Sequence, residues 1–283
     1  MSAFGMPGAF GRTAELYPLA DGRAVKLYRR GMDGGLEREL AAARRAAALG
    51  LPVPAVHGVI ELEGRRGLVF DLIDGEDYQH LLESGRVKIE ETARLCGSLH
   101  HQVHRNSGAE LPSIKERLDA RLGRFDDRLP SSTLREARER LDELPDGDRL
   151  LHGDFHPGNL LRADEAAGGG VWIIDWIDAA RGEPAADLAR SFVLYNFHAR
   201  RPDEPAFERG EMTALARRFT RLHLEAYAEV AGEDLDGLFS KLAFWLLPVA
   251  AARLAEDIPG LDELLIPFCN DCARGDERRW LNP

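Results

Sequence analysis

The chain has 283 residues, of which 44% are hydrophobic and 30% are charged, a balance typical of a globular protein with one large or two modest domains. The formal net charge of −11 argues against a nucleic-acid-binding protein, because phosphate backbones are held chiefly by Lys and Arg. There is no apolar run of about eighteen residues and no basic, then apolar N-terminal leader. We therefore expect a cytoplasmic protein without a membrane partner.

The first third of the chain alternates short strand-like runs with turns. Residues 14–17 and 24–28 predict a hairpin, and two further strands are expected at 56–62 and 67–73. Between them, residues 36–49 are rich in Ala, Leu, Glu and Arg and end at a Gly followed by two Pro breakers, which predicts a helix.

From Asp74 onward the pattern changes to helices, expected at 78–82, 89–103, 114–121, 132–144, 186–197, 211–231, 235–246 and 248–257. Strands gathered at the front and helices at the back indicate an α+β protein with two lobes. We place the boundary near Ile73, which gives lobes of residues 1–73 and 74–283.

The segment with most chemical information lies between the two groups of helices. It reads Leu-His-Gly-Asp-Phe-His-Pro-Gly-Asn-Leu-Leu over 151–161 and Val-Trp-Ile-Ile-Asp-Trp over 171–176, with a Gly-rich turn between them. A hairpin would bring Asp154, Asn159 and Asp175 together. The oxygens of Asn159 and Asp175 suit Mg²⁺, and Asp154 is then free to accept a proton.

A simpler interpretation is a turn in which His, Gly, Asp and Pro have only structural roles. Against it stands Asp175, because an acid that interrupts an apolar strand is costly to bury without a partner. A bound metal ion would explain that acid.

The spacing of His152, Asp154 and Asn159 matches the His-x-Asp-x-x-x-x-Asn catalytic loop of protein kinases. With Gly at the second position and Ile-Asp-Trp around Asp175, the segment resembles the aminoglycoside phosphotransferase family. This resemblance implies a two-lobed protein-kinase-like fold, with a strand-rich nucleotide-binding lobe and a helical catalytic and substrate-binding lobe. It also implies transfer of the γ-phosphate of ATP, or of GTP, to a hydroxyl of a small molecule, with Asp154 as base and Mg²⁺ on Asn159 and Asp175.

The resemblance assigns Lys26, which lies in an apolar strand, to the nucleotide phosphates and Glu39 to its helix partner. Glu37 is the rival partner, and Lys26 could instead be an outward-facing residue that keeps its ammonium in water. Gly11, with Gly5 and Gly8, would form a loop over the phosphates, although a flexible N-terminus is the alternative.

By the same resemblance, Asp71 and Ile73 lie at the hinge where backbone groups read the adenine. His156 would either donate a hydrogen bond to the transferred phosphate or support the loop. Asp187 would accept backbone N–H bonds from the catalytic loop, or simply cap the next helix.

Family members act on aminoglycosides, macrolides, choline, homoserine, thiamine and sugars, so the family does not name the acceptor. The short stretch from Asp175 to Asp187 leaves no room for a peptide-presenting segment, which favours a small-molecule acceptor over the alternative of a protein serine/threonine kinase. A nucleotide-binding pseudokinase is the other alternative.

The acidic chain, with Asp178, Glu183 and Glu256 expected near the site, favours an amino-bearing alcohol. We expect Glu256 to pair with Arg253.

Overall fold

The computed structural model describes residues 9–10, 13–124, 128–165, 169–197 and 209–281. Its contacts form two compact units. The first contains Met1–Arg86 and Pro157–Ala179, and the second contains Val87–His156 and Ala180–Pro283. The first unit thus combines two stretches that are distant in sequence, whereas the lobe boundary near Ile73 stays a prediction.

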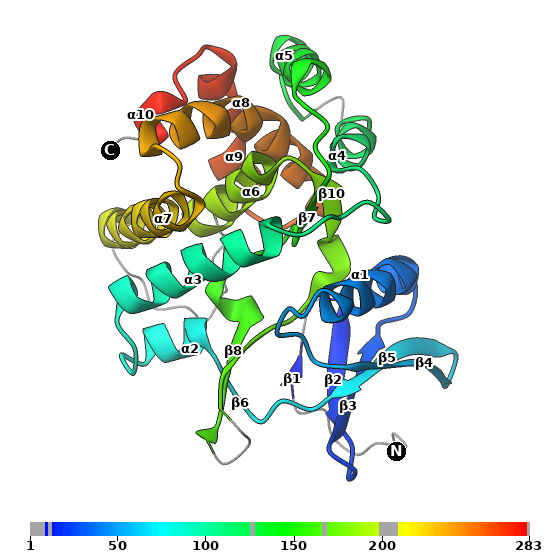
Figure 1. Cartoon of the computed structure of the whole chain (residues 1–283). Coiled ribbons are helices and arrows are strands. Elements are labelled where there is room, and N and C mark those ends of the chain that lie inside the picture. Colours follow the sequence, from blue (N-terminus) through cyan, green and yellow to red (C-terminus); the bar gives the residue numbers. More distant parts are fainter. Residues whose placement is uncertain (1–8, 11–12, 125–127, 166–168, 198–208, 282–283) are drawn as a thin grey trace. The chain divides into compact units, whose positions relative to one another are not determined.

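The first unit contains a five-stranded antiparallel sheet in the order β1-β2-β3-β5-β4 (Figure 1). Its strands are β1 (Ala9–Phe10), β2 (Ala14–Pro18), β3 (Arg23–Tyr28), β4 (Val56–Leu62) and β5 (Arg65–Asp71). Side chains alternate across β3 with a period of two. Val25 and Leu27 pack in a cluster on one face, and Tyr28 packs in another with Leu36, the first residue of α1 (Leu36–Ala48). Lys26 shares the parity of Tyr28 and so lies on the α1 side.

The predicted hairpin of the motif is present as β8 (Leu160–Ala163) and β9 (Val171–Ile173). It adds β6 (Gly75–Asp77) to form a second sheet in the order β6-β8-β9. Single turns of 3-10 helix lie beside it, η2 (Pro157–Asn159) before β8 and η4 (Trp176–Asp178) after β9. The remaining short elements of this unit are η1 (Asp33–Gly35) and α2 (Tyr78–Glu83).

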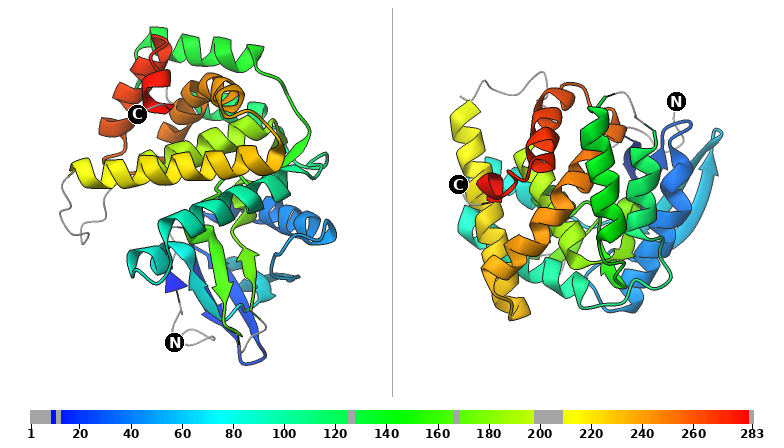
Figure 2. Two further views of the ribbon diagram at one scale, coloured as in Figure 1. Left: turned by 60° about the vertical axis from the view of Figure 1, so that its left-hand side comes forward. Right: turned by 90° about the horizontal axis from the view of Figure 1, so that it is seen from above.

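The second unit is helical (Figure 2). Among the described residues, its core is formed by buried side chains of seven helices, with Phe192, Trp245 and Phe268 among the largest. A two-stranded ribbon pairs β7 (Arg149–Leu151) with β10 (Ala180–Gly182). The helical elements are α3 (Ile89–His104), α4 (Ile114–Leu122), α5 (Ser131–Glu143), α6 (Pro184–Asn196), α7 (Arg209–Ala231), α8 (Leu235–Arg253), η5 (Leu254–Glu256), α9 (Asp262–Ala273) and α10 (Arg278–Leu281).

One expectation about the helices was wrong. Pro248 was expected to separate two helices, yet α8 continues through it to Arg253. Proline removes one backbone hydrogen bond from a helix interior. Here Trp245, Pro248 and Val249 are all buried, so packing outweighs that loss. The stretch Leu235–Glu256 is also long and apolar enough to cross a membrane, but 78% of its apolar 18-residue window is buried, as expected for a core helix.

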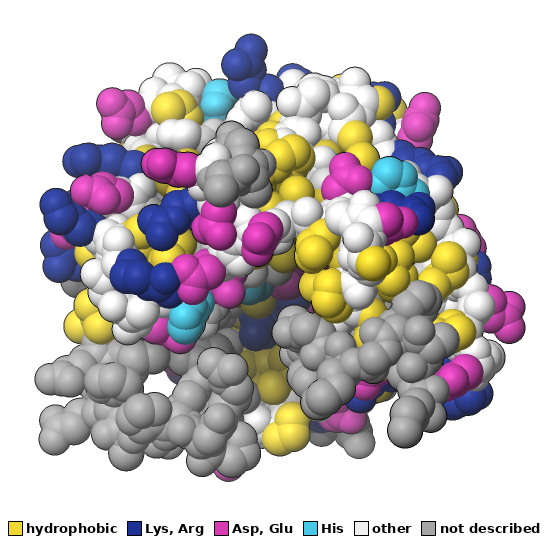
Figure 3. Space-filling model, turned by 90° about the horizontal axis from the view of Figure 1, so that it is seen from below, with side chains coloured by type: hydrophobic (Ala, Val, Ile, Leu, Met, Phe, Trp, Pro, Cys, Tyr) yellow, Lys and Arg dark blue, Asp and Glu magenta, His cyan; other side chains and the backbone are white. Residues whose placement is uncertain are grey.

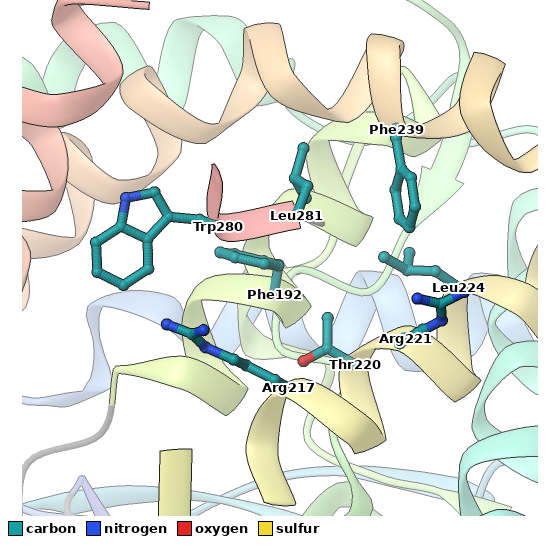
Figure 4. A pocket seen from close by; sticks show the side chains of 8 residues that line it. All are labelled: Phe192, Arg217, Thr220, Arg221, Leu224, Phe239, Trp280 and Leu281. Atoms are coloured by element: carbon teal, nitrogen blue, oxygen red, sulfur yellow. The ribbon is translucent and has the colours of Figure 1, made fainter. Parts of the chain in front are cut away.

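The predicted α+β class is confirmed, since an N-terminal antiparallel sheet is followed by a helical C-terminal part. Cys269 and Cys272 are free, buried thiols on α9 and belong to its packing. A small pocket lies among α6, α7, α8 and α10, where the Arg217 guanidinium lies over the Trp280 ring (Figure 4). None of the residues that line it was predicted to belong to the site.

The packing of α3 on α7 gives the first testable prediction. A Cβ atom on Gly97 would lie only 2.6 Å from His223 O and 2.7 Å from Tyr227 N, both backbone atoms that cannot swing away. Gly97→Ala should therefore lower the free energy of unfolding by about 1–3 kcal/mol, measured by urea denaturation. Gly237→Ala is the control, because the nearest atom to its Cβ is Asp234 Oδ2 at 3.5 Å. Equal stability of the two variants would contradict this close approach.

Candidate active site

Lys26 is held between two carboxylates in the first unit. Its Nζ lies 2.8 Å and 2.9 Å from the two oxygens of Glu39 on α1, and 2.9 Å from Asp175 Oδ1 beyond β9. Burial alone would lower the pKa of Lys26, but Asp175 and Glu39 together raise it above its usual range. Lys26 therefore stays charged, and its ammonium is fixed in direction.

The partner of Lys26 is Glu39, whereas the rival Glu37 contacts Arg66. Glu39 also accepts a hydrogen bond from the hydroxyl of Tyr28, which is fully buried. Sequence reasoning missed Tyr28. The signal that could have found it is its spacing, because residues two apart on a strand share a face.

Asn159 and Asp175 lie at the same end of the β8–β9 hairpin. Asn159 ends η2 directly before β8, and Ile174 N donates to Asn159 O at 3.0 Å. Asp175 follows β9 in a left-handed backbone conformation, φ 64° and ψ 66°, which is uncommon for a residue other than glycine. A carboxylate and an amide oxygen are a donor set that fits Mg²⁺, which keeps other positions for water and phosphate. Their role as metal ligands stays a prediction.

The remaining predicted site residues of the first unit concern nucleotide contacts. Asp71 ends β5, and its carboxylate lies 2.6 Å from His57 Nε2. Ile73 follows in the connection to β6 and is half-buried. The prediction that the backbone at these two positions contacts adenine stays a prediction. Gly11, like Gly5 and Gly8, lies outside the described residues.

Asp154 belongs to the second unit, because the division between the units falls after His156. Its carboxylate lies 3.6 Å from His156 Nε2 and 3.6 Å from Arg190 Nη2. Burial raises the pKa of Asp154, but His156 and Arg190 outweigh it and hold the pKa below its ordinary value. The carboxylate is therefore ionised at neutral pH, as a proton acceptor must be. His156 contacts the proposed base itself.

One face of α6 holds the backbone of the loop that carries Asp154. Asp187 accepts hydrogen bonds from His152 N at 2.6 Å and Gly153 N at 2.9 Å. Gly153 has a φ of 80°, a conformation that glycine adopts without strain. The other contacts run from Arg190 Nε to Gly153 O at 3.3 Å, and from Ser191 Oγ and Tyr195 OH to Phe155 O at 2.8 Å and 3.3 Å.

Asp187, Arg190, Ser191 and Tyr195 are spaced so that they share one side of a helix. Only Asp187 was singled out from the sequence. The signal for the others was available, since three polar side chains at helical spacing follow it in an otherwise apolar segment. The sequence could not say that they contact backbone atoms of the loop.

Histidines surround Asp187 in the second unit. His100 Nε2 and His104 Nε2 lie 3.1 Å and 3.2 Å from Asp187 Oδ2, and His100 Nδ1 lies 3.2 Å from His223 Nε2. His100, His104 and Asp187 could offer ligand atoms to a metal ion. We interpret them as a network of polar contacts, because His104 Nε2 is hydrogen-bonded to Asp187, His100 Nδ1 is hydrogen-bonded to His223, and the carboxylate already accepts two backbone N–H groups.

The three acidic residues expected near the acceptor do not all belong to the same unit. Glu183 precedes α6 at its N-terminus, and Asp178 ends η4 of the first unit. Glu256 lies in η5, where its carboxylate is 2.6 Å from Arg190 Nη2. On the face of the molecule in Figure 3, the described acidic and basic side chains lie interspersed. The net charge is therefore not gathered into a single acidic area on that face.

Residues 19–232 match the phosphotransferase enzyme family. The chain belongs to this family. Solved structures of aminoglycoside phosphotransferases share the fold of this phosphotransferase. The aminoglycoside-3'-phosphotransferase of type VIII is 19% identical with a TM-score of 0.57, and covers 89% of this chain and 93% of its own. No curated protein sequence matches the chain.

Two further structures of the same class contain ligands. APH(3'')-Id from Streptomyces rimosus, in complex with ADP and streptomycin, is 18% identical with a TM-score of 0.55, covering 84% of this chain and 90% of its own. The ternary complex of APH(2'')-IIa with streptomycin and ATP is 14% identical with a TM-score of 0.58, covering 98% and 92%. At these identities the likeness establishes the fold of this phosphotransferase and leaves its acceptor open.

The buried histidines predict a pH dependence of stability. Burial, and then the neighbouring His104, lower the pKa of His100 to about 4, and burial lowers that of His223 well below its ordinary value near 6.5. Between pH 6.5 and 4 these two histidines thus bind more protons in the unfolded chain than in the folded one. The free energy of unfolding should fall as the pH drops, by up to about 1.4 kcal/mol per pH unit for each histidine.

Urea denaturation at several pH values measures this slope. His223→Asn keeps a hydrogen-bonding side chain but binds no proton in this range, so its slope should be shallower. A free energy of unfolding that stays level from pH 6.5 to 4 in the parent protein would contradict the lowered pKa values of His100 and His223.

Proposed function

We propose that this phosphotransferase transfers the γ-phosphate of ATP, or of GTP, to a hydroxyl group of a small molecule with the help of Mg²⁺. The observation that carries the proposal is the Lys26–Glu39–Asp175 cluster. It fixes an ammonium beside a carboxylate whose other oxygen is suited to a metal ion, and both charges are needed next to nucleotide phosphates.

In this proposal each residue has a separate task. Lys26, oriented by Glu39, binds the phosphates, while Asn159 and Asp175 would hold Mg²⁺, which would supply positive charge beside the phosphates. Asp154 orients the acceptor hydroxyl and takes its proton. Complexes of distant structural relatives with ADP and with ATP support a nucleotide as phosphate donor.

A small-molecule acceptor is favoured over a protein because Asp175 and Asp187 are separated only by η4, β10 and the first turn of α6. Such a short connection cannot present a peptide. The pseudokinase alternative is disfavoured because an acid or amide occupies every position that the chemistry requires. Among acceptors, the net charge favours an amino-bearing alcohol such as an aminoglycoside. The charged side chains that contact Asp154 also influence which acceptor can bind. We also propose a cytoplasmic location.

Nucleotide binding is tested first by thermal unfolding with Mg-ATP. A ligand at a hundredfold excess over its Kd adds about 2.7 kcal/mol to the stability of the folded state, which raises the Tm. Asp175→Asn should remove the Mg²⁺-dependent part of the shift. Asp164→Asn, at an exposed site after β8, is the matched control and should keep it. An unchanged Tm of the parent protein with Mg-ATP would sink the nucleotide assignment.

The role of Asp154 is tested by turnover. Asp154→Ala should lower kcat for ADP release by about 10²- to 10⁴-fold, the range expected for a lost general base, while the Mg-ATP shift in Tm is retained. Asp146→Ala, at an exposed position of the same unit, should leave kcat unchanged. Near-normal turnover of the Asp154 variant would transfer the role to another acid, with Asp178 as the first candidate.

A further inference from the structure

Arg190 lies between two carboxylates in the second unit. Its Nη2 is 2.6 Å from Glu256 Oε1 and 3.6 Å from Asp154 Oδ1. The side chains of Arg190 and Glu256 are only 10% and 12% exposed. The same guanidinium donates through Nε to Gly153 O, so its position is fixed from the backbone as well.

A second guanidinium completes the group. Arg121 Nη1 lies 3.7 Å from Glu256 Oε1, so two carboxylates and two guanidinium groups lie within one contact chain. The formal charges of Asp154, Glu256, Arg190 and Arg121 cancel. Because Arg190 and Glu256 are largely shielded from water, salt and solvent screen their attraction weakly.

These contacts decide what an incoming acceptor meets beside Asp154. A polycation is recognised through carboxylates that can pair with its ammonium groups. Here Glu256 Oε1 is already paired with Arg190, and an ammonium that bound this oxygen would have to break that largely buried ion pair. Removing one member of a buried ion pair is strongly unfavourable.

We propose that the acceptor of this enzyme is electrically neutral around its reacting hydroxyl, and that Arg190 is the residue that excludes polycationic acceptors. The inference rests on the proposed function, in which Asp154 receives the acceptor hydroxyl. It replaces the amino-bearing alcohol that total charge suggested with a neutral hydroxyl compound, because the local charges and not their sum act on the acceptor.

The test is calorimetric binding of kanamycin, a polycationic probe, without nucleotide and therefore without turnover. The parent protein should bind it no better than millimolar. Arg190→Met leaves Asp154 and Glu256 without this guanidinium and should bind it at least about tenfold more tightly, with a strong salt dependence. Arg190→Lys keeps the charge and should show no such gain. Arg135→Met is the control for net charge, since Arg135 is exposed and pairs within α5.

Micromolar binding of kanamycin by the parent protein, or a folded Arg190→Met variant with no gain in affinity, would overturn the proposal. If circular dichroism shows that Arg190→Met is unfolded, the parent protein is titrated with kanamycin and with its fully N-acetylated, uncharged derivative. The proposal requires that the charged form is not preferred, and a preference of about tenfold or more overturns it.

Failure of this proposal about the acceptor can be distinguished from failure of the proposed function. Binding of the probe does not depend on ATP, whereas the nucleotide assignment depends on the Mg-ATP shift in Tm. A gain in Arg190→Met together with an unchanged Tm in Mg-ATP would reject the kinase assignment alone.

Discussion

The position of the loop that carries Asp154 depends on hydrogen bonds to the buried carboxylate of Asp187. An ionised acid without partners would be very costly to bury. Asp187 is 2% exposed, yet its two oxygens accept backbone N–H groups of His152 and Gly153 and contact two histidines. These contacts hold the pKa of Asp187 well below its usual range although burial raises it. The charge thereby fixes the loop that carries Asp154.

Burial keeps His100 neutral, because it lowers the pKa of that histidine by more than the Asp187 carboxylate raises it. His100 stacks on the ring of Phe155 with centroids 4.1 Å apart, so the network supports the loop from its side chains as well as from its backbone. Ser191 and Tyr195 add hydrogen bonds to Phe155 O. A loop held at consecutive backbone positions has little freedom to tilt, and such preorganisation is what a catalytic carboxylate requires.

Charge pairing has opposite consequences in the two units. In the first, Lys26 contacts Glu39 and Asp175, and the ammonium is thereby aimed beside the predicted metal ligands. In the second, Arg190 contacts both Asp154 and Glu256, so that a guanidinium lies between the proposed base and the second carboxylate. The total charge of −11 therefore says little about the acceptor, because Coulomb interactions fall off within a Debye length and are decided by neighbours.

The sequence by itself determined the α+β class, the strands β2 to β5, the β8–β9 hairpin and the helices α1 to α8 apart from the break expected at Pro248, but not α9, α10 or the short strands β1, β6, β7 and β10. It also supplied part of the set of residues from which the candidate site is drawn. It could do so because strand and helix periods, turn residues and motif spacing are local properties of the chain. It also favoured Glu39 over Glu37, and the helix period places Glu39 on the buried side of α1.

Only the tertiary structure decided how charges and hydrogen bonds pair over long sequence separations. Tyr28 with Glu39, Arg190 with Glu256, and His100 with Asp187 are distant in sequence and meet only after the helices and strands have packed. The backbone at Pro248 could not be predicted from local sequence either, since the burial of α8 outweighs the tendency of proline to end a helix. Local patterns fix what each segment can form, whereas partners are selected by burial, which acts on the folded chain as a whole.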